Sequence, residues 1–121
     1  MSDPEQVEII GDAYYCVGGC PDRCEPQEHA SAVIDAALAM LRILPRICES
    51  HTLGRDSGVM PSLQMRVGIH TGPVIAAVVG KTDPRYHLFG RTVSYAEKME
   101  STGTPGAVQV RDLNYRYYIS C

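Results

Sequence analysis

The sequence predicts an α+β fold of the ferredoxin-like type, a mainly antiparallel sheet with helices on one face. Two observations predict it: one long segment carries apolar residues at helical spacing, and strand-like apolar runs stand before and after it, with a second, short helix expected near the C-terminal end. The predicted order is strand pair, helix, strand pair, short strand, helix, strand, which differs from the regular alternation that builds a parallel sheet. We therefore expect a single domain over residues 1–121.

The first predicted element is a β-hairpin near the N-terminus. Val7 to Ile10 is apolar and β-branched apart from Glu8, and Gly11-Asp12 supplies a turn signal. The chain resumes with the strand-like segment Tyr14 to Val17. The strand order of a ferredoxin-like sheet normally opens with a strand and a crossover, so we expect the chain to be a fragment or to be completed by a partner.

The longest predicted helix runs from Glu28 to Cys48. Pro45 is expected to mark its fraying end. The segment from Glu49 to Ser62 holds two glycines and a proline and is predicted to be a loop. The helix prediction rests on one apolar stripe with spacings of three and four residues, formed by Val33, Ala36, Ala37, Met40, Leu41 and Leu44.

A second hairpin is predicted from the alternating run Leu63 to His70 and the apolar run Pro73 to Val79, turned at Thr71-Gly72. The remaining predicted elements are a strand over Tyr86 to Phe89, a helix over Thr92 to Ser101 and a strand over Ala107 to Val110.

Composition excludes several classes of function. The formal charge is -3 and no basic run occurs, so nucleic acid is a poor candidate partner. The longest apolar stretch, Val74 to Val79, is far shorter than the roughly 20 residues of a membrane span. Five cysteines make an odd number, which favours a reducing compartment and hence the cytoplasm. Glycines and a proline interrupt the Cys16, Cys20 and Cys24 spacing, so free thiols are favoured over a metal cluster.

Four segments occur in an order and spacing that resemble the catalytic domain of class III nucleotidyl cyclases, the adenylate and guanylate cyclases. They are Val7 to Tyr14, Arg66 to Val74, Pro84 to Val93 and Met99 to Gly103, so the resemblance covers roughly residues 6 to 112. It implies a partial cyclase domain, because the family's opening strand, which carries a first metal-binding aspartate, has no counterpart in this sequence.

The resemblance implies a phosphorus–oxygen lyase that forms a cyclic nucleotide and pyrophosphate from a nucleoside triphosphate. Such domains pair head to tail, as homodimers or heterodimers, and build the active site between them. One chain supplies metal-binding aspartates, and the other supplies the residues for the nucleobase and the transition state. Mg²⁺ or Mn²⁺ suits hard oxygen ligands and would stabilise the entering and leaving oxygens.

The resemblance assigns roles to residues by position. Asp12 matches a metal-binding aspartate, and Arg66 matches a residue that meets the polyphosphate. Glu8 matches the glutamate that accepts hydrogen bonds from guanine, and His87 occupies the second position of the base pocket. Imidazole can donate to guanine O6, so Glu8 with His87 favours GTP over ATP and cyclic GMP as the product.

Two catalytic positions depart from the family pattern. Ser94 stands where the family has its catalytic asparagine, and Lys98 stands where the family has its transition-state arginine. Lysine lacks the planar guanidinium group, which can bind two phosphate oxygens at once. A retained Asp12 beside these replacements favours the metal-donating half of a dimer, inactive as an isolated fragment. The alternatives are a regulatory pseudocyclase or dimerisation domain without turnover, and an incomplete gene product whose sheet lacks a strand.

Overall fold

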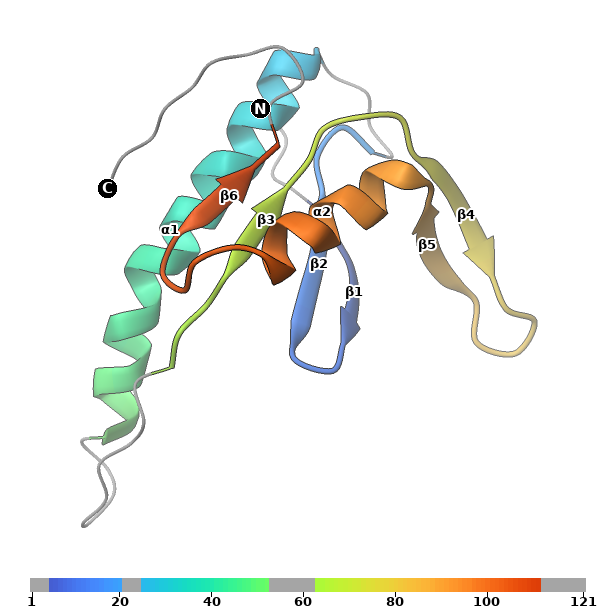
Figure 1. Ribbon diagram of the computed structural model, residues 1–121. Coiled ribbons are helices and arrows are strands. Elements are labelled where there is room, and N and C mark those ends of the chain that lie inside the picture. Colours follow the sequence, from blue (N-terminus) through green and yellow to red (C-terminus); the bar gives the residue numbers. More distant parts are fainter. Residues whose placement is uncertain (1–4, 21–24, 53–62, 112–121) are drawn as a thin grey trace.

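The computed structural model of the chain describes residues 5–20, 25–52 and 63–111 (Figure 1). In chain order the elements are β1 (Glu5–Ile10), β2 (Ala13–Val17), α1 (Pro26–Thr52), β3 (Val67–Ile69), β4 (Ile75–Val79), β5 (Arg85–Phe89), α2 (Arg91–Ser101) and β6 (Val108–Val110). In the described ranges β1 pairs with β2 and β4 with β5, both antiparallel, whereas β3 pairs with β6 in parallel. The predicted α+β class, with antiparallel strands and two helices, is confirmed.

The hairpin of β1 and β2 confirms the first predicted strand pair. Its turn contains Gly11, whose φ of 60° lies in the left-handed region that glycine adopts without steric cost. A register shift between Gln6 and Glu8 marks a bulge, after which Glu8 stands opposite Tyr15. Directly opposite residues of an antiparallel pair point to the same face, so Glu8 and Tyr15 share one face of the hairpin.

Helix α1 is longer than the sequence predicted, because Pro45 lies inside it rather than at its end. A proline removes one backbone hydrogen bond, and here the helix continues through Thr52 in spite of that loss. Residues 49–52 of the predicted loop are therefore helical, while residues 53–62 lie outside the described part of the chain. The end of β2 packs closely on α1, since a Cβ on Gly18 would come within 2.8 Å of the Val33 side chain.

The predicted second hairpin is wrong. β3 does not pair with β4 across Thr71-Gly72; β4 pairs with β5 instead, through a turn in which Gly80 has a φ of 116°. The hydroxyl of Thr92, the buried second residue of α2, donates to the carbonyl of Pro73 at 2.6 Å. This bond holds the segment after β3 against the start of α2, so the chain leads away from β3 before β4 begins.

Helix α2 packs directly on β3 through Gly68. A Cβ at this position would overlap the backbone nitrogen of Glu100 and the carbonyl oxygen of Ala96, so only glycine allows this approach. Figure 1 shows α2 crossing the molecule between β3 and the hairpin of β4 and β5. Among the described residues the buried positions are Ala32, Ala37, Ile69 and Thr92, which is a small core centred on α1, β3 and α2.

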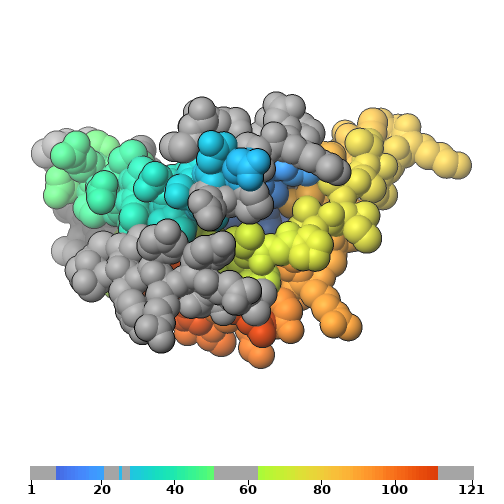
Figure 2. Space-filling model, turned by 90° about the horizontal axis from the view of Figure 1, so that it is seen from above, coloured from blue at the N-terminus to red at the C-terminus, as the bar shows by residue number. Residues whose placement is uncertain are grey.

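The hairpin of β4 and β5 carries apolar side chains on the surface. Figure 2, seen from above, shows the yellow and orange end of this hairpin extending away from the body of the molecule. Its exposed large apolar residues are Ile75, Val78, Val79 and Phe89. No helix in the described ranges combines the length and the hydropathy that crossing a membrane requires.

Candidate functional site

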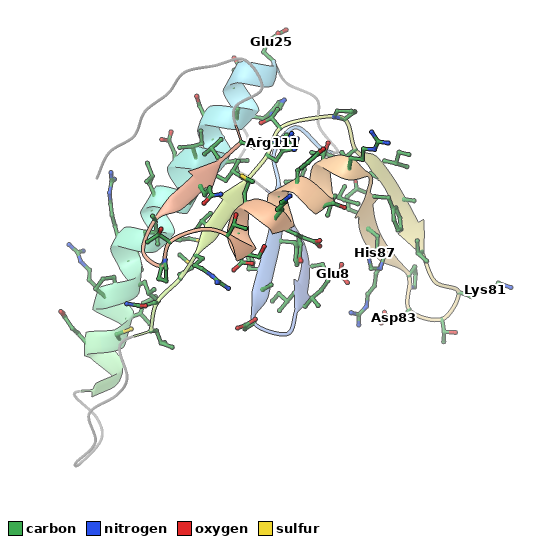
Figure 3. The ribbon with its side chains drawn as sticks, in the orientation of Figure 1. Glu8, Glu25, Lys81, Asp83, His87 and Arg111 are labelled. Carbon is green, nitrogen blue, oxygen red and sulfur yellow. The ribbon has the colours of Figure 1, made fainter. Side chains whose placement is uncertain are left out.

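The central feature of the site is a contact between a glutamate of β1 and a histidine of β5. The Oε2 atom of Glu8 lies 3.2 Å from Nδ1 of His87, and both side chains are about three-quarters buried. Figure 3 shows the two side chains pointing toward one another across the space between the strands. The two positions that the sequence assigned to a base pocket are therefore neighbours, although they stand far apart along the chain.

A second contact joins the same hairpin to α2. The hydroxyl of Tyr15, which stands opposite Glu8 in the strand register, donates to Oε1 of Glu97 at 3.1 Å. Burial raises the pKa of Tyr15, and the hydrogen bond to Glu97 and the charges of Glu97, Glu100 and Glu8 raise it further. The phenol thus remains a neutral donor, and α2 is fixed over the face of the hairpin that carries Glu8.

Ser94 and Lys98 lie on α2 four residues apart, which places them on one face of the helix. Both side chains are exposed, and neither forms a side-chain hydrogen bond or ion pair with another residue in the described ranges. Lys98 directly follows Glu97, the residue bound by Tyr15. A hydroxyl and an ammonium are therefore presented to solvent beside the helix turn that contacts β2.

Arg66 is engaged by an acid of the same helix. Its guanidinium lies 2.9 Å from the carboxylate of Glu100, with both side chains roughly half-exposed. This ion pair connects the residue before β3 to the last turn of α2. Arg66 remains accessible to a solvent-borne anion, but such an anion would compete with Glu100 for it.

Asp12 lies apart from these contacts, exposed in the turn between β1 and β2. No cluster of three or more His, Cys, Asp or Glu side chains able to hold a metal ion occurs in the residues that the structure describes. A solvent-accessible carboxylate is a hard oxygen donor and fits Mg²⁺ or Mn²⁺ chemically. As one ligand it can contribute to an ion site but cannot form a complete one.

Another cluster lies where β3, α2 and β6 meet. The rings of His70 and Tyr95 stack edge to face at 5.1 Å, and the guanidinium carbon of Arg111 lies 3.7 Å from the centroid of the Tyr95 ring. The Nδ1 atom of His70 is buried without a hydrogen-bond partner in the described structure. Burial and the charge of Arg111 lower the pKa of His70, while a hydrogen bond with the Arg111 backbone opposes this shift. A hydrogen bond from the Arg111 side chain and its charge lower the pKa of Tyr95.

The sequence did not single out the partners of the predicted site residues. Tyr15 and Glu97 lie outside the four segments that carry the family resemblance, and Glu100 lies in the segment Met99 to Gly103 without an assigned role. Helical spacing was one indication that Glu97 belongs to the site, because Glu97 follows Ser94 by three residues and so lies on the same side of α2. The strand register that brings Tyr15 beside Glu8 was a second signal once the hairpin was predicted.

Comparison with solved structures defines the class of protein. The guanylate cyclase domain of RhGC from Catenaria anguillulae, solved in complex with GTP, superposes with a TM-score of 0.72 at 32% identity and covers 88% of this chain. The non-canonical dimeric guanylyl cyclase domain of the RhoGC fusion protein from Blastocladiella emersonii gives 0.70 at 31% identity. The fold is that of a class III cyclase catalytic domain, and this chain spans 53% and 54% of those two chains.

Sequence comparison gives the family. The model of the adenylate and guanylate cyclase catalytic domain matches residues 2–118, and the chain belongs to this family. Guanylate cyclase soluble subunit beta-2 of Rattus norvegicus is 46% identical over 116 residues, and soluble guanylate cyclase gcy-35 of Caenorhabditis elegans is 43% identical over 112 residues. These matches cover 96% and 93% of this chain but only 16% and 15% of the relatives.

Proposed function

We propose that the chain contributes to a nucleotide cyclase that converts GTP into cyclic GMP and pyrophosphate for intracellular signalling. In this reaction the ribose 3′-oxygen loses its proton and attacks the α-phosphorus, and pyrophosphate leaves. Membership of the cyclase family supports the reaction class. The contact of Glu8 with His87 at 3.2 Å supports guanine as the base in this chain's own pocket, which selects the substrate if the protein works as a homodimer.

The two side chains match the hydrogen-bonding edge of guanine. Guanine offers the donors N1–H and the exocyclic amine, which one carboxylate can accept together, and the acceptor O6. Adenine presents an acceptor at N1, which would face the Glu8 carboxylate without a proton between them. Leaving such a buried polar atom unpaired costs about 1–3 kcal/mol, or roughly one to two decades of discrimination.

Asp12 is the residue of this chain that would hold a divalent ion, Mg²⁺ or Mn²⁺. When bound in such enzymes, the ions stabilise the attacking and leaving oxygens of an in-line displacement. The exposed position of Asp12 at the tip of the hairpin leaves its carboxylate available to a site completed by other ligands. Alone, one carboxylate gives weak affinity, because oxygen-ligand affinity follows the number and charge of the ligands.

The chain acts, in this proposal, as the metal-donating half of a dimer with a second cyclase domain. Ser94 and Lys98 lack the amide and the planar guanidinium that stabilise charge on a transferring phosphate in this family, and Arg66 is occupied by Glu100. The productive site would therefore combine Asp12 with the asparagine and arginine of the partner domain. The pocket of Glu8 and His87 would then belong to the second, silent site.

The same observations favour one alternative, a regulatory pseudocyclase that binds a nucleotide or a partner domain without turnover. In that case the exposed side of α2 that carries Ser94 and Lys98 would have no catalytic role in any dimer. The two functions differ in what happens when an intact partner is supplied.

Complementation distinguishes them. The full-length protein that contains this chain should be mixed with a cyclase domain that carries an intact asparagine and arginine but lacks its metal aspartates, and cyclic GMP formation measured. We expect activity that neither component has alone. Asp12→Asn should abolish it, whereas Lys98→Ala, the matched control on the silent side, should retain it. Loss of activity with Lys98→Ala and tolerance of Asp12→Asn would show that the halves are reversed, and no activity in any mixture would support the pseudocyclase.

A further inference from the structure

The ring of Tyr95, on helix α2, is held by the two residues that follow β3 and β6. These strands are parallel, so His70 and Arg111, which directly follow them, lie at the same end of the strand pair. The Arg111 amide donates to the carbonyl of Ile69 at 3.2 Å. The His70 ring contacts the Tyr95 ring edge to face at 5.1 Å, and the guanidinium carbon of Arg111 lies 3.7 Å from the Tyr95 ring centroid. Two neighbours therefore fix the position of the phenol.

Arg111 has more hydrogen-bonding capacity than these contacts use. Its guanidinium carries five N–H groups in one plane, and one hydrogen bond from this side chain goes to the Tyr95 hydroxyl. Among the described residues, no carboxylate lies within ion-pair distance of Arg111. Because the Tyr95 oxygen accepts from Arg111, the hydroxyl hydrogen can still be donated to a ligand. Both side chains are partly exposed, so a ligand can reach these donors.

The charges of α2 are divided between two sides of the helix. Arg91 precedes Tyr95 by four residues and Lys98 follows it by three, so both cations lie on the Tyr95 side. The two glutamates of α2 lie on the other side, where each is bound by a residue of another element. The pKa of Tyr95 is lowered first by the hydrogen bond and charge of Arg111 and then by Arg91 and Lys98, although burial opposes this shift. Three cations therefore surround one phenol.

We propose that Arg91, Tyr95 and Arg111 form a binding site for an anion with two linked phosphate groups, such as inorganic pyrophosphate. Phosphate oxygens accept charge-assisted hydrogen bonds, and each guanidinium can bind two of them at once. Arg91 and Lys98 lie about 10 Å apart along the helix axis, a span that two linked phosphate groups cover more fully than one tetrahedral ion does. One phosphate group would meet Arg111 and Tyr95, and the other a cation of the helix. The site uses neither the proposed base pocket nor the metal-binding carboxylate, so it does not depend on the proposed function.

Isothermal titration calorimetry of the full chain with pyrophosphate tests the proposal, at low ionic strength and with a chelator that removes divalent ions. We expect pyrophosphate to bind about tenfold or more tightly than inorganic phosphate, because it engages more of the cations. Arg91→Gln and Arg111→Gln should each weaken pyrophosphate binding by about tenfold or more, and Tyr95→Phe by about threefold, since it removes one hydrogen bond. Arg85→Gln is the matched control and should bind as the unsubstituted chain does, because Arg85 is exposed but bound by Asp83 in another hairpin.

Three results of the titration would each overturn the proposal: no binding of pyrophosphate, equal affinity for phosphate and pyrophosphate, or an equal loss in Arg85→Gln. Arg91 is exposed and has no side-chain contact in the described ranges, so Arg91→Gln keeps the test decisive even if Arg111→Gln does not fold. The place of binding can be read from the ring signals of ¹³C-labelled tyrosine, with Tyr95 assigned through Tyr95→Phe. We expect the Tyr95 signal to move as pyrophosphate is added; a Tyr95 signal that stays fixed while pyrophosphate binds would also overturn the proposal.

Discussion

Arg66 and Glu100 form an ion pair of 2.9 Å that ties the residue before β3 to the last turn of α2. It lies beside the close approach of Gly68 to the backbone of the same helix. The two contacts differ in kind. The side chains of the ion pair are about half-exposed to solvent, whereas at Gly68 a side chain would overlap backbone atoms of the helix. They are therefore expected to respond to substitution on very different scales.

Glu100→Gln should change the free energy of unfolding by less than about 1 kcal/mol, because exposed ion pairs contribute little. It should also release Arg66, so the affinity for GTP relative to guanosine should rise a few-fold if Arg66 meets the polyphosphate. Chemical denaturation and equilibrium binding measure the two effects. Glu97→Gln, on the same helix but bound to Tyr15, is the matched control, and an equal gain in that variant would argue against a role for Arg66.

Gly68→Ala should destabilise the protein by about 3 kcal/mol or more, since the new methyl group would overlap backbone atoms of Ala96 and Glu100 that cannot move independently. Gly11→Ala is the control: its Cβ would meet no atom within 4 Å, and only the left-handed backbone conformation opposes it, at a cost of about 1–2 kcal/mol. Denaturant unfolding of both variants measures the difference. Equal losses would mean that α2 does not pack on β3 as described.

His70 should make the protein less stable in mild acid. Its pKa is lowered in the folded state by burial and by Arg111, so the unfolded chain takes up the proton at a higher pH. The contribution of the neutral His70 ring to the free energy of unfolding is thus fully present above the ordinary pKa of 6.5 and declines as the pH falls below that value. Urea unfolding between pH 7.5 and pH 5.5 should show a smaller loss of stability in His70→Phe than in the unsubstituted chain. An unchanged loss would assign the acid sensitivity to other groups.

Two tyrosines should titrate in opposite directions when their partners are neutralised. Glu97→Gln should lower the pKa of Tyr15, because it removes a nearby negative charge that opposes ionisation. Arg111→Gln should raise the pKa of Tyr95, because it removes a cation that favours the phenolate. Difference ultraviolet titration of each variant against the unsubstituted chain measures both. A shift of the same sign in the two variants would contradict the contacts described for α2.

Local patterns predicted most of the elements but not all of their pairings. The Gly11-Asp12 turn and the helices α1 and α2 depend on residues that are close together in the sequence, so they could be predicted from local sequence patterns. The parallel pairing of β3 with β6 depends on contacts between distant segments. The error at Thr71-Gly72 arose because a turn signal was assumed to join the strands on either side, whereas Thr92 binds Pro73 and redirects the chain.

For the candidate site, the roles of the residues stay predictions, and only the positions of the residues can be compared. Family resemblance proposed Glu8 and His87 for one pocket, and they lie in contact. Their direct contact at 3.2 Å, and the ion pair of Arg66 with Glu100, could not be predicted because each depends on side-chain geometry across separate elements. Likewise, the sequence predicts a helix end near Pro45, because it does not show that the helix continues to Thr52 in spite of the hydrogen bond that a proline removes.

The pairing of β3 with β6 also has a consequence for the order in which the protein is made. The hairpins of β1 with β2 and of β4 with β5 join neighbouring segments, and such hairpins form within roughly 1–10 μs. β3 must wait for a partner that lies about 40 residues further along the chain. At about 5–20 residues per second, a ribosome needs roughly 2–8 seconds to supply it. During that interval the edge of β3 that later pairs with β6 is unpaired, and a chaperone has seconds in which to bind it.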